Sequence, residues 1–369
     1  MKVLVLGTGT EYYPALKVLY CVRAMGAYVE TAGFGIDILR YSRYSKHHTL
    51  VNFCSGGVPV PETQDWLCRY VEENSFDIVV PSDIESASFL AATKIVCNHI
   101  QCFPCSNAET LNTLNNKWTF AEICHQHSLS APTTVLLESF DQLEEGLFDE
   151  VGFPLIVKPL EKDGGKGVVR LNSYRSLLEY VQKNSPYSQF PLIAQSFIPG
   201  HNIDISILAA DGQILCSTVQ SWINDVILVF TSNPDMYDIA TRIIQELNYD
   251  GLAHFDMRID ARTDKVYVLE CNPRAWNTIA ASMWQGVNFI EAGISFVREG
   301  IVPPMDKFAA QGRHCLSGSS LLKQFFLPFS GWQNISTGGI KAFLHAARDP
   351  LPHIVRKYQQ LNHTSHSFE

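Results

Sequence analysis

The chain has 369 residues, of which 46% are hydrophobic and 18% are charged, a composition typical of a globular protein and unlike that of a disordered chain. At roughly 100–200 residues per domain, this length predicts two or three domains. The formal net charge is −9, with 28 Lys and Arg residues against 37 Asp and Glu residues. This balance argues against nucleic acid or an anionic membrane as the main partner, because both attract basic surfaces.

No stretch of the sequence approaches the roughly 18 apolar residues that a membrane-spanning helix needs. The N-terminal segment 1–7 is too short for a signal peptide, and Gly7 interrupts it too soon. We therefore expect a cytoplasmic protein. In a reducing cytosol, the ten cysteines are expected to form no disulfides.

Cysteine and histidine residues cluster near position 100. Cys97, His99, Cys102 and Cys105 lie within nine residues, and a Cys-x-x-Cys pair can supply two zinc ligands. The alternative is a buried strand in which the cysteines act as small apolar residues. Pro104 inside the pair, and the lack of a second Cys-x-x-Cys in the sequence, favour the strand.

Residues 1–111 are predicted to form an α/β domain with a parallel sheet, because short apolar runs alternate with helical patterns. The expected strands are 2–6, 28–32 and 77–81, and the expected helices are 14–25 and 66–74. A turn with Gly7 and Gly9 follows the first strand, and Glu30 ends the second, as in dinucleotide-binding folds. Tyr12 stands where the third glycine of that motif would be, which argues against nicotinamide chemistry.

The remaining chain is predicted to form three further parts. Residues 112–190 form a small lid subdomain, with helices expected at 111–127 and near 142–149 and a strand at 154–159. Residues 191–300 form a central subdomain of α+β character, with strands at 192–197, 203–209, 214–220, 251–260 and 265–271 and a helix at 235–247. Residues 301–369 are expected to be a helical C-terminal extension.

A lysine precedes a glycine-rich loop in the lid. Lys158 leaves an apolar strand shortly before Gly164, Gly165 and Gly167. Glycines let the backbone approach a ligand closely, and the loop amides could cover phosphates that the lysine neutralises. The alternative is an ordinary hairpin turn, and this segment alone does not decide between the two.

Strands 251–260 and 265–271 are predicted to form a β-hairpin around Thr263. Pairing residues whose numbers sum to 526 places Asp256 opposite Glu270 and His254 opposite Asn272, and the alternation of side chains puts all four on one face. Carboxylates directly opposite each other repel, whereas a divalent cation such as Mg²⁺ or Mn²⁺ would bind them both. A solvated acidic face is the alternative, but the apolar strand that leads into Glu270 argues against it.

The segment 268–274, VLECNPR, resembles the Glu-x-Asn-Pro-Arg signature of the ATP-grasp superfamily, in particular its carboxylate–amine ligase and carbamoyl-phosphate-synthetase-like branch. Asp256 stands fourteen residues before Glu270, where that family has an acid or glutamine. The resemblance covers about residues 1–300. It implies an ATP-grasp fold, with an N-terminal pre-ATP-grasp domain of parallel sheet, a lid and a central antiparallel sheet that carries the metal site.

The resemblance also implies roles for individual residues. Asp256, Glu270 and Asn272 would hold two Mg²⁺ ions on the triphosphate of ATP, and Arg274 would reach the transferred phosphoryl group. Lys117 and Lys158 would contact phosphates, with the glycine loop above them. The backbone of the hinge would read adenine and a following polar residue would bind ribose: Gln195, Ser196, Phe197, Ile198 and Asn202.

Three positions depart from the family pattern. Glutamate is usual where Gln195 stands, and acids are usual where His201 and Asn202 stand. Gln195 can still form a hydrogen bond with adenine, and Asn202 with a ribose hydroxyl, but neither adds charge. The departures therefore bear on nucleotide preference and leave the metal-binding residues intact.

The activity that the resemblance implies is ATP-dependent joining of a small-molecule carboxylate, through an acyl phosphate, to an amine such as that of an amino acid, with release of ADP and phosphate. The acceptor carboxylate is expected beside the turn 7–10 or the segment 81–85, although Asp83 and Glu85 also suit a helix N-terminus. A carboxylate–thiol ligase, a small-molecule kinase and a non-catalytic ATP-binding module are the alternatives. The resemblance also leaves a homodimer as one possible oligomeric state, because ATP-grasp relatives are often dimers.

Overall fold

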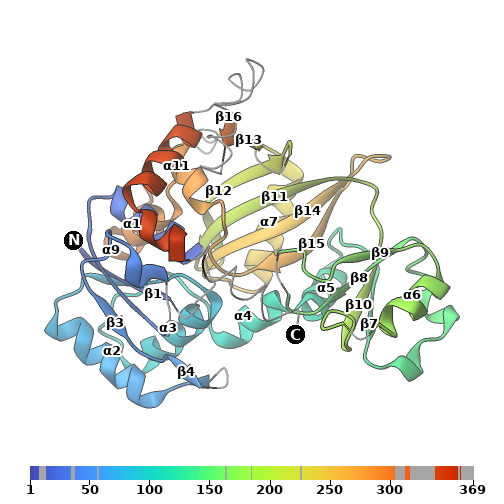
Figure 1. Ribbon diagram of the computed structural model, residues 1–369, viewed down its shortest axis with the longest axis horizontal. Coiled ribbons are helices and arrows are strands. Elements are labelled where there is room, and N and C mark those ends of the chain that lie inside the picture. The colour runs from blue at the N-terminus through green and yellow to red at the C-terminus, as the bar shows by residue number, and fades with distance from the viewer. Residues whose placement is uncertain are drawn as a thin grey trace.

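The computed structural model describes residues 1–7, 14–34, 38–55, 58–162, 164–183, 185–224, 227–303, 312–315, 337–355 and 358. Residues 8–10 of the expected glycine turn lie outside this set. In Figure 1 the N-terminal sheet lies at lower left and the lid at right, with a large central sheet between and above them. Within the described residues, no helix is both long and apolar enough to cross a membrane.

The N-terminal region contains a four-stranded parallel sheet in the order β3-β2-β1-β6. The strand β1 is central, and all but the first of its residues are buried. This confirms the parallel sheet, with β3 as a short strand that the sequence did not reveal. The strands are β1 (Lys2–Gly7), β2 (Tyr28–Gly33), β3 (His48–Leu50) and β6 (Ile78–Pro81), the helices are α1 (Pro14–Ala24), α2 (Pro61–Glu73) and α3 (Ile84–Val96), and a two-stranded ribbon joins β4 (Cys54–Ser55) to β5 (Val58–Pro59).

The cysteine-rich segment behaves as a strand-like buried segment. Cys102 forms a parallel bridge with Val79 and is buried. Among the described residues, no cysteine belongs to a group of side chains placed to hold a metal ion. The expectation of no disulfides is wrong, because Cys68 in α2 is bonded to Cys97 at the end of α3.

The lid contains a four-stranded antiparallel sheet in the order β7-β10-β8-β9 (the lid sheet) and a helix, α6 (Tyr174–Val181). Its strands are β7 (Thr134–Leu137), β8 (Leu155–Pro159), β9 (Val169–Leu171) and β10 (Leu192–Ser196). Because β10 pairs with both β7 and β8, the lid sheet extends beyond the expected boundary at residue 190.

Two expected helices of the lid differ in the structure. The helix expected at 111–127 is broken at Asn116 into α4 (Ala108–Asn115) and α5 (Lys117–Gln126). Asn116 has an extended backbone, and its side chain caps α5 by accepting hydrogen bonds from the amides of Trp118 and Thr119. The helix expected near 142–149 is instead two short 3₁₀ turns, Phe140–Gln142 and Glu145–Phe148.

The central sheet has six strands in the order β15-β14-β11-β12-β13-β16, and all of its strand pairs are antiparallel. The helix α7 (Pro234–Glu246) covers one face, where its isoleucines pack on those of β11. The sheet strands are β11 (Gly200–Ala210), β12 (Gln213–Trp222), β13 (Ile227–Thr231), β14 (Gly251–Asp260), β15 (Val266–Asn272) and β16 (Gly312–Cys315). The strand β16 lies in the segment that was expected to be helical.

Among the described residues, the helices α8 (Ile279–Trp284), α9 (Phe289–Glu299) and α11 (Thr337–Arg348) come after β15 in the chain. They share one hydrophobic cluster with α1, β1 and the face of the central sheet opposite α7. Just after α11, the buried carboxylate of Asp349 accepts hydrogen bonds from Ser42 Oγ (2.6 Å) and from the Arg43 amide (2.9 Å). The end of α11 is thereby fixed to the N-terminal domain (Figure 1).

Candidate active site

The hairpin β14–β15 has the register that the sequence predicts at its functional end. Asp256 is paired with Glu270, and His254 is paired with Asn272. The register shifts by one residue after Asp256, where Met257 is paired with Val268. Leu269 is therefore an extra residue in β15, and this bulge reconciles the pairing at the acidic end with the pairing near the loop.

The same face of the central sheet carries two rows of polar side chains, which cross four neighbouring strands. This polar face points away from α7. The other face of the sheet, which α7 covers, is lined by apolar residues of β11 and β14. In each row the residues are directly paired from strand to strand. The first row is Gln220, Asp204, Asp256 and Glu270, and the second is Thr218, Ser206, His254 and Asn272.

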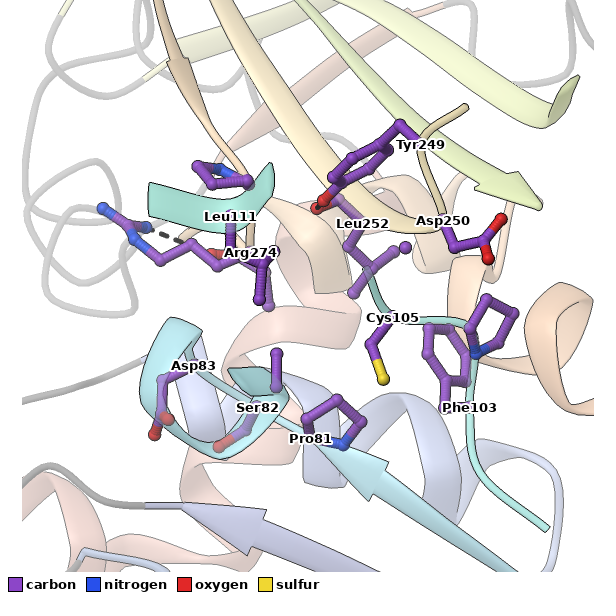
Figure 2. A pocket seen from close by; sticks show the side chains of 15 residues that line it. Pro81, Ser82, Asp83, Phe103, Cys105, Leu111, Tyr249, Asp250, Leu252 and Arg274 are labelled. Carbon is purple, nitrogen blue, oxygen red and sulfur yellow. Dashed lines mark hydrogen bonds between the residues drawn. The ribbon is translucent and has the colours of Figure 1, made fainter. Parts of the chain in front are cut away.

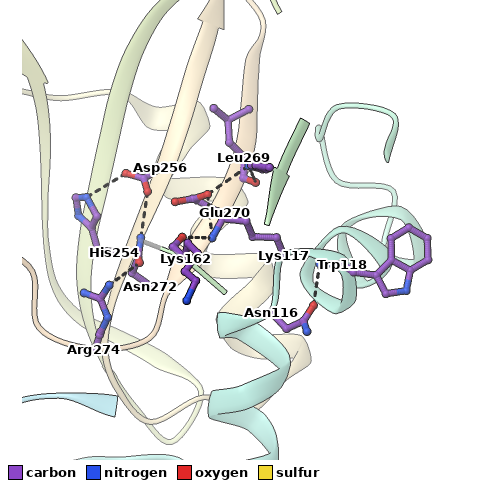
Figure 3. A network of polar contacts seen from close by, with 11 residues as sticks. Asn116, Lys117, Trp118, Lys162, His254, Asp256, Leu269, Glu270, Asn272 and Arg274 are labelled. Atoms are coloured by element: carbon purple, nitrogen blue, oxygen red, sulfur yellow. Dashed lines mark hydrogen bonds and ion pairs between the residues drawn. The ribbon is translucent and has the colours of Figure 1, made fainter. Parts of the chain in front are cut away.

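Two buried lysines from different elements converge on Glu270, and Figure 3 shows Lys117 beside it. Lys158 Nζ, from the lid strand β8, lies 3.3 Å from Glu270 Oε2, and Lys117 Nζ, from the first residue of α5, lies 3.5 Å from the same oxygen. Both lysines are about 95% buried, at 5% and 6% exposure. Burial lowers the pKa of Lys158, although the charge of Glu270 opposes this effect.

A chain of hydrogen bonds links Asp256 to Arg274 on the other side of the cluster. Asn272 Nδ2 donates to Asp256 Oδ2 (3.0 Å), and the Arg274 guanidinium donates to Asn272 Oδ1 (3.0 Å). Figure 3 shows Asp256, Asn272 and Arg274 in line, with Glu270 and Lys117 beside them. The structure therefore brings together Lys117, Lys158, Asp256, Glu270, Asn272 and Arg274.

The carboxylates of the first row differ in their electrostatics. Burial would raise the pKa of Asp256, but the hydrogen bond to His254 and the charge of His254 lower it to about 2. Burial raises the pKa of Glu270, and it raises the pKa of Asp204 to about 7. Three carboxylates lie side by side here, and the two lysines are paired with only one of them, Glu270.

Two residues of this face, Asp204 and Arg258, were missed from the sequence. Asp204 of β11 is paired with Asp256, and Arg258 of β14 is paired with Asn202. The alternation of side chains that placed Asp256 on this face also places Arg258 there, two residues later in the same strand. The position of Arg258 could therefore have been predicted from the sequence. Asp204 carried no such signal, because its partner Asp256 lies on a strand that follows three further elements.

The glycine loop lies next to the lysines. Gly164, Gly165 and Gly167 have positive φ angles of 63°, 72° and 76°, which only glycine adopts without cost. Lys117 Nζ donates to the carbonyl of Lys162 (2.7 Å), so the loop is tied to the same buried amine that contacts Glu270. A ligand bound at the lysines would therefore meet the loop.

The expected nucleotide hinge joins the lid sheet to the central sheet. The Gln195 side chain is buried and donates to Thr134 Oγ1 (2.9 Å). The amides of Ser196 and Phe197 donate to carbonyls within the lid. The Arg258 guanidinium donates to the carbonyls of Ile198 (2.5 Å) and Gly200 (2.7 Å).

Arg258 also donates to the Asn202 side chain. The same guanidinium lies 5.6 Å from the centre of the Phe197 ring. The two ends of the expected nucleotide hinge are thus held together by one arginine. These residues are joined to one another, and the contacts described for them do not extend to Glu270.

A pocket lies between the N-terminal domain and the central sheet, with Arg274 at its wall (Figure 2). Asp83 caps α3 and accepts a hydrogen bond from the Ser86 amide (2.8 Å). The polar groups of the lining come from the end of β6, the start of α3, the segment before α4 and the turn before β14: Ser82, Asp83, Cys105 and Asp250, together with Arg274.

Two families of ATP-grasp domains match parts of this chain. One is described as ATP-grasp in the biosynthetic pathway with Ter operon and matches residues 188–312. The other is the ATP-grasp domain of prokaryotic glutathione synthetase and matches residues 122–224. Together these matches cover residues 122–312, which include the lid sheet and the strands β11 to β15 of the central sheet, with the hairpin that carries Asp256 and Glu270.

Curated relatives and solved structures agree with these matches. The carbamoyl phosphate synthase large chain of Xylella fastidiosa is 25% identical over 239 residues, which are 59% of this chain and 20% of that protein. This chain thus spans about one fifth of that relative's length. The formate-dependent phosphoribosylglycinamide formyltransferase of Prochlorococcus marinus is 24% identical over 285 residues, which are 71% of this chain and 70% of the relative.

Two solved structures share the fold at low sequence identity. The L-amino acid ligase of Bacillus licheniformis has a TM-score of 0.60 at 17% identity and covers 80% of this chain and 74% of that one. The N5-carboxyaminoimidazole synthetase of Staphylococcus aureus has a TM-score of 0.63 at 14% identity and covers 88% and 85%. The chain therefore has the ATP-grasp fold, and the resemblance seen in its motifs is confirmed.

Proposed function

We propose that this ATP-grasp protein is an ATP-dependent ligase that activates a small-molecule carboxylate as an acyl phosphate and joins it to an amine. One observation carries the proposal: two buried lysines, one from the lid and one from α5, meet a paired acidic site on the central sheet. Buried cations are costly unless they are paired. Lysines held in this way suit a polyanionic ligand such as the triphosphate of ATP.

The donor atoms near Asp256 fit a hard divalent cation. Asp256 and Glu270 present two carboxylates, which are ligands that Mg²⁺ and Mn²⁺ prefer. Asn272, whose Nδ2 donates to Asp256 in this structure, would add an amide oxygen after rotation of its side-chain amide. Mutual repulsion of the carboxylates favours binding of a cation between them. When bound, such a cation would neutralise charge on the phosphates of ATP. Two ions, as in the family pattern, are part of this proposal.

The chemistry requires that an oxygen of the acceptor carboxylate attacks the γ-phosphorus of ATP and that the bond to ADP breaks. The amine then attacks the acyl carbon, and phosphate leaves. Lys117 and Lys158 hold and neutralise the phosphates, and Arg274 stabilises the charge that develops on the transferred group. The amides of the glycine loop cover the phosphates and exclude water from the acyl phosphate.

We place the acceptor carboxylate in the pocket of Figure 2. The pocket is lined by Arg274 and, at the carboxyl end of the strand β6, by Pro81 and Ser82. A planar guanidinium can bind a carboxylate through two hydrogen bonds. Arg274 also contacts Asn272, so a carboxylate held there would lie next to the acidic cluster.

Adenine and ribose binding at the hinge is likewise part of the proposal. Gln195, Ser196, Phe197, Ile198 and Asn202 lie at the junction of the lid and central sheets, where the base of a nucleotide with its phosphates at Lys158 would lie. Several of these groups already have partners within the chain. Nucleotide binding there would use the backbone and side-chain groups that remain.

The test is release of ADP by the full chain with ATP, Mg²⁺ and a mixed pool of carboxylates and amines, with the products identified by mass spectrometry. We expect carboxylate-dependent ADP formation and an amide product. Glu270→Gln should reduce the rate at least 100-fold and keep the fold, as judged by circular dichroism. Glu179→Gln, an exposed glutamate paired with Arg175 in α6, is the matched control and should retain activity.

Two outcomes would contradict the proposal. Full activity in Glu270→Gln would show that the acidic pair is not the reaction centre. Turnover with a hydroxyl acceptor, together with none for any carboxylate, would identify a kinase.

A further inference from the structure

The acidic face of the central sheet extends beyond the residues of the family signature. Asp204 lies on β11, next to β14, and is paired directly with Asp256. One ligand atom from each of Asp204, His254 and Asp256 lies within 4.8 Å of the other two. Two metal–ligand bonds of about 2.1–2.4 Å span such a distance, so a single ion between them could reach all three side chains.

We propose that Asp204, His254 and Asp256 form a second cation site, which selects Mn²⁺ over Mg²⁺ through the imidazole of His254. The site rests on the proposed function, because Asp256 is shared with the Asp256, Glu270 and Asn272 set. It differs from that set in its nitrogen ligand and in its position on the β11 side of Asp256.

The hydrogen bonds of His254 suit a metal ligand. Its Nδ1 lies 2.8 Å from Ser206 Oγ, which can accept the Nδ1 proton. The Nε2 atom lies 3.3 Å from Asp256 Oδ1, to which it donates while it is protonated. A cation bound between the two side chains would take the place of that proton. Metal-binding histidines are typically oriented in this way by a partner on the other nitrogen.

Packing holds the ring of His254 in place. The imidazole is stacked on Trp276, with ring centres 5.7 Å apart and an angle of 15° between the planes. The residue lies on β14 and is paired with Ser206 on one side and Asn272 on the other. A ligand on a rigid strand, with a stacked neighbour, is held close to the geometry that an ion requires.

The charges around the site also favour a cation. Of the three carboxylates in the row, Glu270 is paired with both Lys117 and Lys158. Asp204 is paired with neutral Gln220 on one side and with Asp256 on the other. A divalent ion would compensate the charge of Asp204 and Asp256, whereas the ion pairs described for Lys117 and Lys158 are with Glu270.

The ligand set indicates which ion it would take. Magnesium is bound almost entirely by oxygen, whereas imidazole nitrogen suits first-row transition ions, and Mn²⁺ accepts both carboxylate and imidazole. The oxygen-only set at Glu270 shows no such preference. The neighbouring positions would thus differ in selectivity, and Asp256 would bridge them.

The experiment measures Mn²⁺ binding to the full chain without nucleotide or substrate, from the loss of the free-ion signal in electron paramagnetic resonance. We expect His254→Gln and Asp204→Asn each to weaken Mn²⁺ binding about 10–100-fold and to leave Mg²⁺ binding within about threefold. His125→Gln removes an exposed histidine at the end of α5 and serves as the matched control, with no change expected.

A second measurement does not depend on the folding of any variant. Pulsed electron paramagnetic resonance of the wild-type Mn²⁺ complex should show coupling to one ligand nitrogen. Mn²⁺ binding without nitrogen coupling, or with unchanged affinity in folded His254→Gln, would overturn the second site and leave the proposed ligase function standing. If the wild-type protein showed nitrogen coupling but formed no ADP with any carboxylate and amine, the proposed ligase function would be overturned and the second cation site would stand.

Discussion

Glu270 is the acceptor for both buried lysines, so each lysine is already paired with an anion before a nucleotide binds. Phosphate oxygens can take over this role, and the carboxylate of Glu270 is then available to a cation. The exchange keeps every buried charge compensated in both states. Nucleotide and divalent cation should therefore favour each other's binding at this site.

Removing one lysine tests its assignment to phosphate. We expect Lys158→Ala to weaken ATP binding about 10–100-fold, because a charge-assisted contact in a buried site contributes roughly 1.5–3 kcal/mol. Adenosine, which has no phosphate, should bind with nearly unchanged affinity. Isothermal titration calorimetry with both ligands measures the difference.

The matched control is Lys183→Ala, which removes an exposed lysine of the lid and should change neither affinity. Equal losses for ATP and adenosine in Lys158→Ala would mean that Lys158 acts on the shape of the site as a whole, and would contradict its role at phosphate.

Residue-level prediction succeeded where partners are close in sequence. The pairing of Asp256 with Glu270 followed from a short loop and the alternation of side chains, and the structure confirms it. The same rule fails beyond Asp256, because the bulge at Leu269 shifts the register. Asp204 was not predicted, since its pairing with Asp256 depends on strand order in a six-stranded sheet, which local pattern does not encode.

At the scale of elements, helix caps and short strands account for most differences between the elements expected from the sequence and those in the structure. The apolar pattern of 111–127 fits one helix, but Asn116 caps a new one by bonding to the amides of Trp118 and Thr119. This break puts Lys117 at the first position of α5, next to Glu270. The functional lysine thus depends on a local helix boundary that hydrophobic periodicity alone does not show.

The glycine loop is the element whose conformation can be tested most directly. Gly165 has φ of 72°, and a Cβ added there would meet no atom within 4 Å. A side chain would therefore strain the backbone by about 1–3 kcal/mol without a clash. We expect Gly165→Val to uncouple the reaction, with more ADP than amide formed at saturating amine, because an incompletely closed loop admits water to the acyl phosphate.

Gly146→Val provides the control, since Gly146 is exposed in a 3₁₀ turn of the lid and has no positive φ. Its ratio of ADP to amide should stay at one, as in the wild type. A ratio of one in a Gly165→Val variant that still turns over would mean that another element excludes water.

At the scale of the whole molecule, the hydrophobic clusters divide the chain into unequal parts. The lid has its own cluster, whose members all lie between Val135 and Ala194. By contrast, the N-terminal domain shares a cluster with α8, α9 and the central sheet, and the segment after α11 is bonded to Ser42. The N-terminal and central parts therefore share one packed core, whereas the lid has a core of its own.

This division predicts how the molecule opens. In native-state hydrogen exchange, the amides of β7, β8 and β10 should exchange together, at an opening free energy several kcal/mol below that of β1, β11 and β14, because separate cores open separately. ATP with Mg²⁺ should slow exchange in the lid more than in β1, since Lys158 and the glycine loop belong to the lid whereas Asp256 and Glu270 belong to the central sheet. A ligand that contacts both parts is stabilised only when they are held together. If the lid and β1 instead exchanged at one common free energy with and without nucleotide, the two cores would be coupled, and closure of the lid over the phosphates could not be a separate step.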